Sequence, residues 1–249
     1  TTNGPPTSGT LAVTPYRGMA LTTEFEFLLD GWSDDADDYP LTYTYGYRQQ
    51  RRTRRTASGY KPEQLVPLVA DQYASAWFVT TLPQAKNVNV SCVGRTFDRY
   101  LSYAEVQQPA RVDELVISTE DLTELADDLL SSSLDTSDGE ASLSLISNVA
   151  SVLGATPKSV NGSEVEKTPE ELAAETALID NLFAATLSAA SLVGTGTSAA
   201  ATTQVLSTVS TLSANPEALS EDSQTGALDL LDNVVGGSAE TGIDPDAAA

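Results

Sequence analysis

The aromatic side chains of this 249-residue chain are confined to its first part. Of the 16 Phe, Trp and Tyr residues, 15 lie between Tyr16 and Tyr103, and the only later one is Phe183. The core of the second part must therefore be built from smaller aliphatic side chains. Because the two parts cannot share one kind of core, the sequence predicts two domains rather than one large one.

In the first part, apolar residues recur at every second position in several short runs. A period of two is typical of strands that bury one face, and several such strands in about 100 residues predict a β-sandwich. We expect Trp32 and Trp77 to pack in its core, and Cys92 to be a small buried hydrophobic residue. The runs are Leu11 and Val13; Leu21, Thr23, Phe25 and Phe27; Tyr43, Tyr45 and Tyr47; Trp77 and Val79; and Val88, Val90 and Cys92.

From Arg111 onward, the apolar residues are spaced by three and four, which is typical of amphipathic helices. Thr168-Pro169-Glu170-Glu171 has the residues of a helix start, with a capping Thr, a first-turn Pro and a capping-box Glu. The predicted fold class is therefore β followed by α, with a sandwich over residues 1–108, a helical array over 109–237 and a linker or tail over 238–249. The predicted stripes are Leu122, Leu125, Leu129 and Leu130; Leu143, Ile146, Ala150 and Leu153; Leu172, Thr176, Ile179, Phe183, Leu187 and Ala190; Val205, Leu206, Val209 and Leu212; and Ala227, Leu228, Leu231, Val234 and Val235.

The charge and the rare residues exclude several functions. Residues 111–249 hold 3 Lys and Arg against 24 Asp and Glu, so this part carries nearly all of the chain's net charge of -22. Because its surface repels phosphate groups, nucleic acids and anionic membranes are poor partners for this part. The absence of histidine excludes His-dependent triads and His-ligated metals, and a single cysteine excludes an intrachain disulfide. We therefore expect no enzymatic activity and no cofactor other than a possible calcium ion.

An acidic cluster in the sequence "GWSDDADDYPLTYTYGY" separates two predicted strands. Its members Asp34, Asp35, Asp37 and Asp38 allow three interpretations. A solvated turn is the favoured one, because aspartates in turns bond to nearby backbone. A calcium site is the alternative, although the loop lacks the EF-hand pattern. A carboxylate pair for glycoside hydrolysis is the third interpretation. It is disfavoured because the general acid and the general base need different environments, and aspartates on one flexible loop share the same one.

Two further surface features carry possible functions. Asn89-Val90-Ser91 and Asn161-Gly162-Ser163 are N-glycosylation sequons, and the strand alternation turns Asn89 toward solvent. The segment "RQQRRTRRTASGY" supplies a basic loop in an acidic protein. Its arginines suit a plain exposed loop, docking onto an acidic partner or onto the acidic second part of the same molecule, or cleavage by a basic-site protease. The basic residues of this loop that we assign to partner binding are Arg51, Arg52, Arg54 and Arg55.

An ordered set of residues in the first part forms a recognisable pattern, most specific in its Gly-Trp-x-Asp-Asp and Pro-Leu-x-Tyr core. The residues of the pattern are Pro5, Pro6, Gly9, Leu11, Val13, Pro15, Gly18, Ala20, Leu21, Thr23, Phe25, Gly31, Trp32, Asp34, Asp35, Pro40, Leu41 and Tyr43. Over about residues 1–108 it resembles the receptor-for-egg-jelly (REJ) module of polycystin-1-like proteins and sperm receptors. The resemblance implies a fibronectin-III-like or PKD-like sandwich on a ciliary or gamete surface.

A second pattern lies near the end of the helical part. It consists of Val209 to Leu212, Asn215-Pro216, Leu219-Ser220, Ser223-Gln224 and the stripe from Ala227 to Val235. With these residues the second part is similar to the helical part (subdomain A) of a GAIN domain, which follows the REJ module in polycystin-1-like proteins. Since there is no histidine, the self-cleaving triplet of such domains cannot lie here. The resemblance implies an extracellular segment of a larger membrane glycoprotein on a cilium or flagellum. Its expected partners are a polycystin-type channel, an extracellular filament or glycoprotein ligand and adjacent domains of the same chain.

Overall fold

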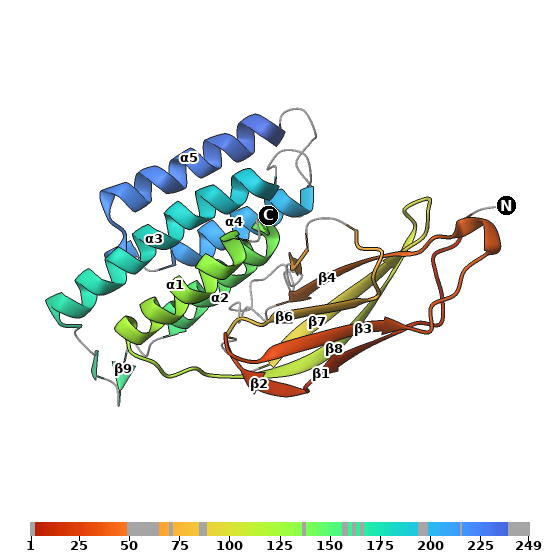
Figure 1. The fold of residues 1–249 in the computed structure, drawn as a ribbon, viewed down its shortest axis with the longest axis horizontal. Coiled ribbons are helices and arrows are strands. Elements are labelled where there is room, and N and C mark those ends of the chain that lie inside the picture. Colours follow the sequence, from red (N-terminus) through yellow and green to blue (C-terminus); the bar gives the residue numbers. More distant parts are fainter. Residues whose placement is uncertain are drawn as a thin grey trace, which may run out of the picture. The chain divides into compact units, whose positions relative to one another are not determined.

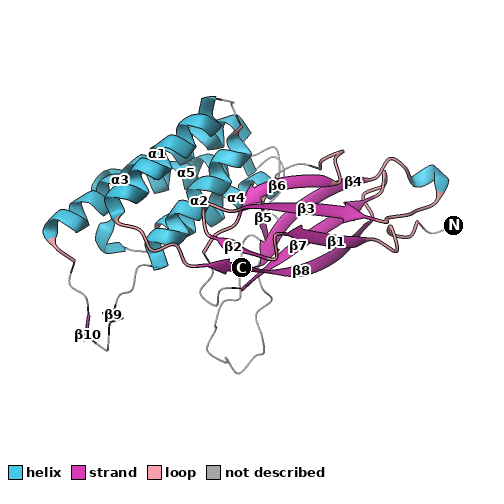
Figure 2. Cartoon of the chain, turned by 60° about the horizontal axis from the view of Figure 1, so that its bottom comes forward, coloured by secondary structure: helices cyan, strands magenta, loops and turns pink. Residues whose placement is uncertain are grey.

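The computed structural model of the chain forms two compact units, Thr1–Asp113 and Glu114–Ala249. The first unit contains strands β1 to β8, and the second contains the five helices α1 to α5 (Figures 1 and 2). The predicted order of β followed by α is therefore confirmed. The structure describes residues 3–48, 65–69, 72–84, 89–135, 138–155, 159–160, 163–164, 167–193, 199–214 and 216–238. The predicted tail over 238–249 lies outside these residues, apart from Ser238.

The first unit consists of two sheets. The smaller sheet has the order β1-β3-β6, and its strands are β1 (Thr10–Thr14), β3 (Glu24–Asp30) and β6 (Trp77–Thr81). The larger sheet has the order β2-β8-β7-β4-β5, with β2 (Arg17–Met19), β8 (Tyr103–Asp113), β7 (Asn89–Phe97), β4 (Thr42–Arg48) and β5 (Leu65–Pro67). Strand β8 thus contains the sandwich boundary predicted at residue 108. Neighbouring strands are antiparallel except β2 and β8, which are parallel.

The chain passes from one sheet to the other within two residues. Pro15 and Tyr16 separate β1, which pairs with β3, from β2, which pairs with β8. The carbonyl of Tyr16 accepts a hydrogen bond of 2.9 Å from the backbone N–H of Arg111. One short N-terminal segment therefore belongs to both sheets and joins their edges.

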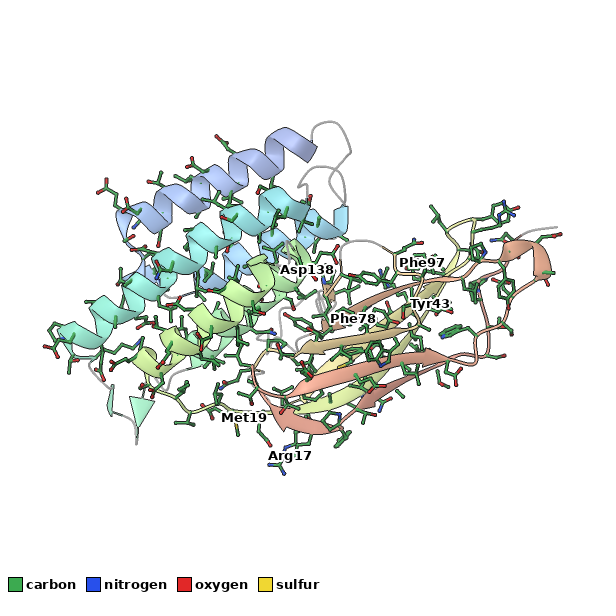
Figure 3. All side chains as sticks on the ribbon, viewed as in Figure 1. Arg17, Met19, Tyr43, Phe78, Phe97 and Asp138 are labelled. Atoms are coloured by element: carbon green, nitrogen blue, oxygen red, sulfur yellow. The ribbon has the colours of Figure 1, made fainter. Side chains whose placement is uncertain are left out.

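Alternating aromatic residues fill the space between the two sheets. Phe25, Phe27 and Leu29 of β3 are buried and alternate with exposed residues, as the period of two predicts. The ring of Phe27 meets Tyr45 of β4 edge-on at 6.0 Å, and Tyr45 stacks on Phe78 of β6 at 5.1 Å. Figure 3 labels Phe78 among the side chains of the sandwich. Because these contacts join the two sheets, the unit is a β-sandwich with an aromatic core.

The expected burial of Trp77 is wrong. Trp77 is 53% exposed, and the adjacent Phe78, which is half-buried, contacts the aromatic core instead. Adjacent residues in a strand point to opposite faces, so only one of this pair can face the other sheet. The ring centroid of Phe78 lies 6.1 Å from that of Phe27 and 5.1 Å from that of Tyr45. Because Phe78 faces the other sheet, Trp77 lies on the outer face.

In the second unit, the helix predicted to start at Thr168-Pro169 begins at Pro169. In the capping box of the third helix, Thr168 Oγ1 accepts the N–H of Glu171 at 3.2 Å, while Glu171 Oε2 accepts the N–H of Thr168 at 2.8 Å. Ser118 Oγ similarly accepts the N–H of Asp121 at 3.1 Å. The helices are α1 (Thr119–Asp135), α2 (Gly139–Ala155), α3 (Pro169–Val193), α4 (Ala199–Leu212) and α5 (Glu221–Ser238). Two short strands, β9 (Ser159–Val160) and β10 (Ser163–Glu164), lie between α2 and α3.

The core faces of α3 and α5 differ from the predicted stripes. Leu172 of α3 is 36% exposed, and on α5 Leu228 and Leu231 are exposed while Leu230 and Val234 are buried. The rotation of α5 is fixed by hydrogen bonds to α3. Ser220 and Ser223, at the start of α5, both donate to Asp180 Oδ1 of α3. Since these serines must face α3, Leu228 and Leu231 turn outward.

Helix α3 is the one helix among the described residues that is long and apolar enough to cross a membrane. It packs instead against α1, α2, α4 and α5. Its buried face includes Glu175, which forms an ion pair with Lys167. This arrangement is that of a core helix in a helical unit.

We predict that Gly9→Ala destabilises the sandwich. An added Cβ at Gly9 would lie 1.9 Å from Cδ2 of Trp32, so the indole or the backbone would have to move. Overpacking of this kind costs about 1–3 kcal/mol. Urea denaturation followed by Trp fluorescence measures the loss.

Gly4→Ala is the matched control, because an added Cβ at Gly4 meets no atom within 4 Å. We expect its unfolding free energy to stay within about 0.5 kcal/mol of the wild type. Equal losses for the two variants would contradict the contact between Gly9 and Trp32.

Candidate metal centre

Three aspartates from two separate segments meet at one end of the sandwich. Asp34 and Asp38 belong to the loop between β3 and β4, in which Ala36–Asp38 forms a single 3-10 turn (η1), and Asp98 follows β7. One carboxylate oxygen from each lies within 4.8 Å of the others. Figure 3 labels Phe97, which is the last residue of β7 and directly precedes Asp98 in the chain. The arrangement gathers three negative charges in a small volume.

The pairing of β4 with β7 brings these segments together. Thr42, the first residue of β4, pairs with Phe97, the last residue of β7. The residues that precede Thr42 therefore lie beside those that follow Phe97. The backbone N–H of Arg99 donates to the carbonyl of Asp38 at 3.0 Å, and Arg99 Nη1 donates to the carbonyl of Asp37 at 3.4 Å. These bonds dock the acidic loop onto the turn between β7 and β8.

Asp98 is held rigidly by the turn that it closes. Its Oδ1 accepts the backbone N–H groups of Tyr100 at 2.7 Å and Ser102 at 2.9 Å, and its Oδ2 accepts Nδ2 of Asn3 at 2.5 Å. The side chain is buried. Burial raises the pKa of Asp98, but hydrogen bonds from Asn3, Ser102 and Tyr100 outweigh it and lower the pKa below its usual value. Asp98 is therefore a fixed anion.

The carboxylates of Asp38 and Asp34 accept fewer hydrogen bonds than the carboxylate of Asp98. Asp38 is 8% exposed, and within the described part of the chain its carboxylate accepts no hydrogen bond. Burial, followed by the charges of Asp34, Asp35, Asp98 and Asp37, raises the pKa of Asp38. Asp34 Oδ1 accepts the N–H of Asp35 at 2.9 Å, but Asp34 Oδ2 is buried without a partner. Both side chains thus have acceptor oxygens ready for a cation.

The structure separates the members of the predicted acidic cluster. Asp34 and Asp38 converge on the centre, whereas Asp35 and Asp37 are not among its ligand oxygens. Asp98 was missed from the sequence, because only the register of β4 and β7 places it beside the loop. A signal was present, since an Asp directly after a strand often closes a turn.

The donor set fits a hard cation. Carboxylate oxygens are the ligands that Ca²⁺ prefers, and Ca²⁺ tolerates irregular sites completed by backbone carbonyls and water. Zn²⁺ favours nitrogen and sulfur ligands, which this centre does not offer. Among the described residues, no Lys or Arg forms an ion pair with any of the three carboxylates. A calcium ion is therefore the best chemical match.

The other predicted site residues fall in different places. Asn89, the first residue of β7, is exposed as expected, while Asn161 lies outside the described residues. The same holds for the basic loop with Arg51, Arg52, Arg54 and Arg55. Cys92 is fully buried, which confirms the prediction of a small buried hydrophobic residue, and burial raises the pKa of its thiol to about 12.

Comparison with known families identifies the module. The family model described as the REJ domain matches residues 1–148 of the 249. The chain belongs to the REJ domain family. None of the curated proteins matches the chain.

The REJ match covers every strand of the sandwich and continues through α1 into α2. It therefore extends past residue 108, the limit of the resemblance seen in the sequence. The REJ domain is a module of polycystin-1-like extracellular regions and is not a known enzyme family. The resemblance of the helices to a GAIN domain stays a prediction.

A charge network on the larger sheet of the REJ domain holds three strands together. Arg48 of β4 and Arg95 of β7 contact Glu105 of β8 at 2.8 and 2.9 Å. Burial raises the pKa of Glu105, but hydrogen bonds from Gln107 and Arg95 and the charges of Arg48 and Arg95 outweigh it and lower the pKa. Arg48 is thus occupied within the sheet.

We predict that Glu105→Gln destabilises the protein by about 1–2 kcal/mol at neutral pH, since hydrogen bonds to charged groups are lost from a partly exposed site. A lowered carboxylate pKa contributes stability above the unfolded value of about 4.3 and loses it as the pH falls through the folded value. The difference from wild type should therefore be constant between pH 6 and 8 and shrink below about pH 4.3.

Urea denaturation at several pH values measures this difference. Glu24→Gln is the control, because Glu24 is an exposed strand residue. We expect a change of less than about 0.5 kcal/mol for it. A Glu105→Gln difference that grew on acidification would contradict the pKa direction.

Proposed function

We propose that the chain is an extracellular structural and adhesive region of a polycystin-1-like membrane glycoprotein on a cilium or flagellum. In this role it transmits force or binds a ligand or extracellular filament, and its parent associates with a polycystin-type channel. The observation that carries the proposal is the REJ match over residues 1–148. The folded sandwich followed by a helical unit is consistent with a load-bearing region.

The strand order supports a fibronectin-III-like sandwich. A three-stranded sheet β1-β3-β6 faces a sheet that includes β5, β4, β7 and β8 in spatial sequence. Sandwiches of this kind are frequent in cell-surface proteins, where their loops and edges bind ligands. We infer that the REJ part of this chain belongs to the same architecture.

The helical unit offers a surface for a neighbouring domain of the same parent. Leu228 and Leu231 lie three residues apart on α5 and are 66% and 38% exposed. Their common face is suited to contact with another domain. This supports the proposal that the second unit corresponds to the helical part of a GAIN domain, which docks the β subdomain that follows it.

The extracellular location predicts a glycan at Asn89. This residue is exposed at the start of β7, and its sequon is Asn89-Val90-Ser91. When the chain is expressed through the secretory pathway, we expect Asn89→Gln to lower its mass by one N-glycan. Mass spectrometry before and after glycosidase treatment measures this change.

Asn87→Gln serves as the control, because Asn87 lies two residues away and outside any sequon. We expect the same mass as the wild type. Biotin labelling of intact cells should also reach the parent protein. The proposal fails if the native mass is insensitive to glycosidase and labelling requires permeabilised cells.

A second candidate function is a calcium-dependent extracellular binding module. The observation that favours it is the convergence of Asp34, Asp38 and Asp98 within 4.8 Å. After chelation, adding calcium at about a hundredfold excess over Kd should raise the melting temperature of the sandwich by at least about 5 °C. A melting temperature that millimolar calcium leaves unchanged would dismiss this candidate.

A further inference from the structure

We propose that Asp34, Asp38 and Asp98 bind one calcium ion, and that Asn3 joins them as a ligand through its side-chain oxygen. The ion would then fasten the N-terminal segment, residues 3–9, to the loop end of the sandwich. This inference rests on the second candidate function and deepens it, because it names the ligands and the part of the fold that the ion controls.

The first argument is the burial of Asp38 together with the unpartnered oxygen of Asp34. Asp38 is 8% exposed, and Asp34 Oδ2 is buried without a hydrogen-bond partner among the described residues. A buried carboxylate oxygen without a partner is costly and is rarely retained without a ligand. One carboxylate oxygen each from Asp34, Asp38 and Asp98 lies within 4.8 Å of the others, so a cation between them would satisfy all three.

The second argument is the independent origin of the ligands. Asp34 and Asp38 come from the loop before β4, and Asp98 comes from the turn after β7, where backbone hydrogen bonds fix its orientation. If the acidic loop were only a solvated turn, nothing would require a buried carboxylate such as Asp98 to lie beside it. Hydrogen bonds from Arg99 to the carbonyls of Asp37 and Asp38 hold the loop against the turn, so the ligands from the two segments stay close together.

The third argument concerns Asn3. Its Nδ2 donates to Asp98 Oδ2 at 2.5 Å, on the oxygen that Tyr100 and Ser102 leave free. The oxygen and nitrogen of an amide exchange places when the group rotates by half a turn. A cation on Asp98 Oδ2 repels the amide N–H and attracts the amide oxygen, so the side chain turns and becomes a ligand.

The position of Asn3 extends the effect of the ion along the N-terminal segment. Thr7 and Ser33 exchange backbone hydrogen bonds of 2.9 and 3.1 Å, so this segment already lies against the acidic loop. Gly9 lies directly under the indole of Trp32. Without the ion, three close negative charges push the loop and the turn apart. With it, residues 3–9, the loop and the turn are held at one point.

Calorimetric titration of the whole 249-residue chain with calcium, after chelation, tests the ligands. We expect one ion per chain. Asp38→Asn should weaken binding by at least about tenfold, since loss of a supporting group alone costs that much. Asp35→Asn is the matched control from the same loop and should bind like wild type. Equal weakening by the two variants, binding of several ions per chain or no heat at millimolar calcium would each overturn the site.

Two variants of Asn3 test its role as a ligand. Asn3→Ala should weaken calcium binding several-fold. Asn3→Asp should keep or tighten it, because a carboxylate can replace the amide oxygen as a ligand. If Asn3 only donates its N–H to Asp98, Asn3→Asp would instead weaken binding at least as much as Asn3→Ala, and the role of Asn3 would be refuted.

Hydrogen exchange tests the fastening of the N-terminal segment. We expect calcium to slow exchange of the Thr7 amide, which donates to the carbonyl of Ser33, by about tenfold or more in the wild type but not in Asp38→Asn. Unchanged exchange on calcium binding would overturn the fastening. Failure of these calcium experiments leaves the glycan and surface-labelling results intact, so it is distinguishable from failure of the extracellular function.

Discussion

The antiparallel pairing of β4 with β7 is the interaction on which both the core and the acidic centre depend. Its register from Thr42 with Phe97 to Arg48 with Ser91 turns Tyr45 toward Phe27 and Phe78 of the opposite sheet. The same register ends with the loop before β4 next to the turn after β7. A shift by one residue would turn every side chain of β4 to the other face and would also separate Asp38 from Asp98. Core packing therefore maintains the geometry of the candidate site.

In the helical unit, buried polar groups have a comparable role. Asp180 on α3 accepts the hydroxyl groups of Ser220 and Ser223, and Glu175 pairs with Lys167. Leucine and alanine on several faces of a helix allow more than one rotation against its neighbours. A buried polar group needs a hydrogen-bond partner, so only the rotation that supplies that partner is stable. The outward position of Leu228 and Leu231 follows from this selection.

The order of elements could be predicted from the sequence because periodicity and capping act locally. The alternation of Phe25, Phe27 and Leu29 and the capping box at Thr168 are read from a few consecutive residues. The face of β6 could not be predicted, since Trp77 and Phe78 are both large aromatics and only the opposite sheet decides between them. The place of Asp98 in the acidic centre could not be predicted for a related reason, although its role in closing a turn could. Asp98 and Asp38 are far apart in the sequence and lie close together only because β4 pairs with β7. Such a long-range contact cannot be read from a few consecutive residues.

The two-residue crossing from β1 to β2 has a mechanical consequence. Strand β2 runs parallel to β8 through Arg17 with Arg111, Gly18 with Val112 and Met19 with Asp113, and Arg17 forms an ion pair with Asp113. When tension pulls the start of β2 and the end of β8 in opposite directions, it slides the two strands along each other and loads all their hydrogen bonds at once. Antiparallel strands pulled open from one end would break their bonds one by one. Under such tension, the short parallel edge would resist in shear at the point where the chain enters and leaves the larger sheet.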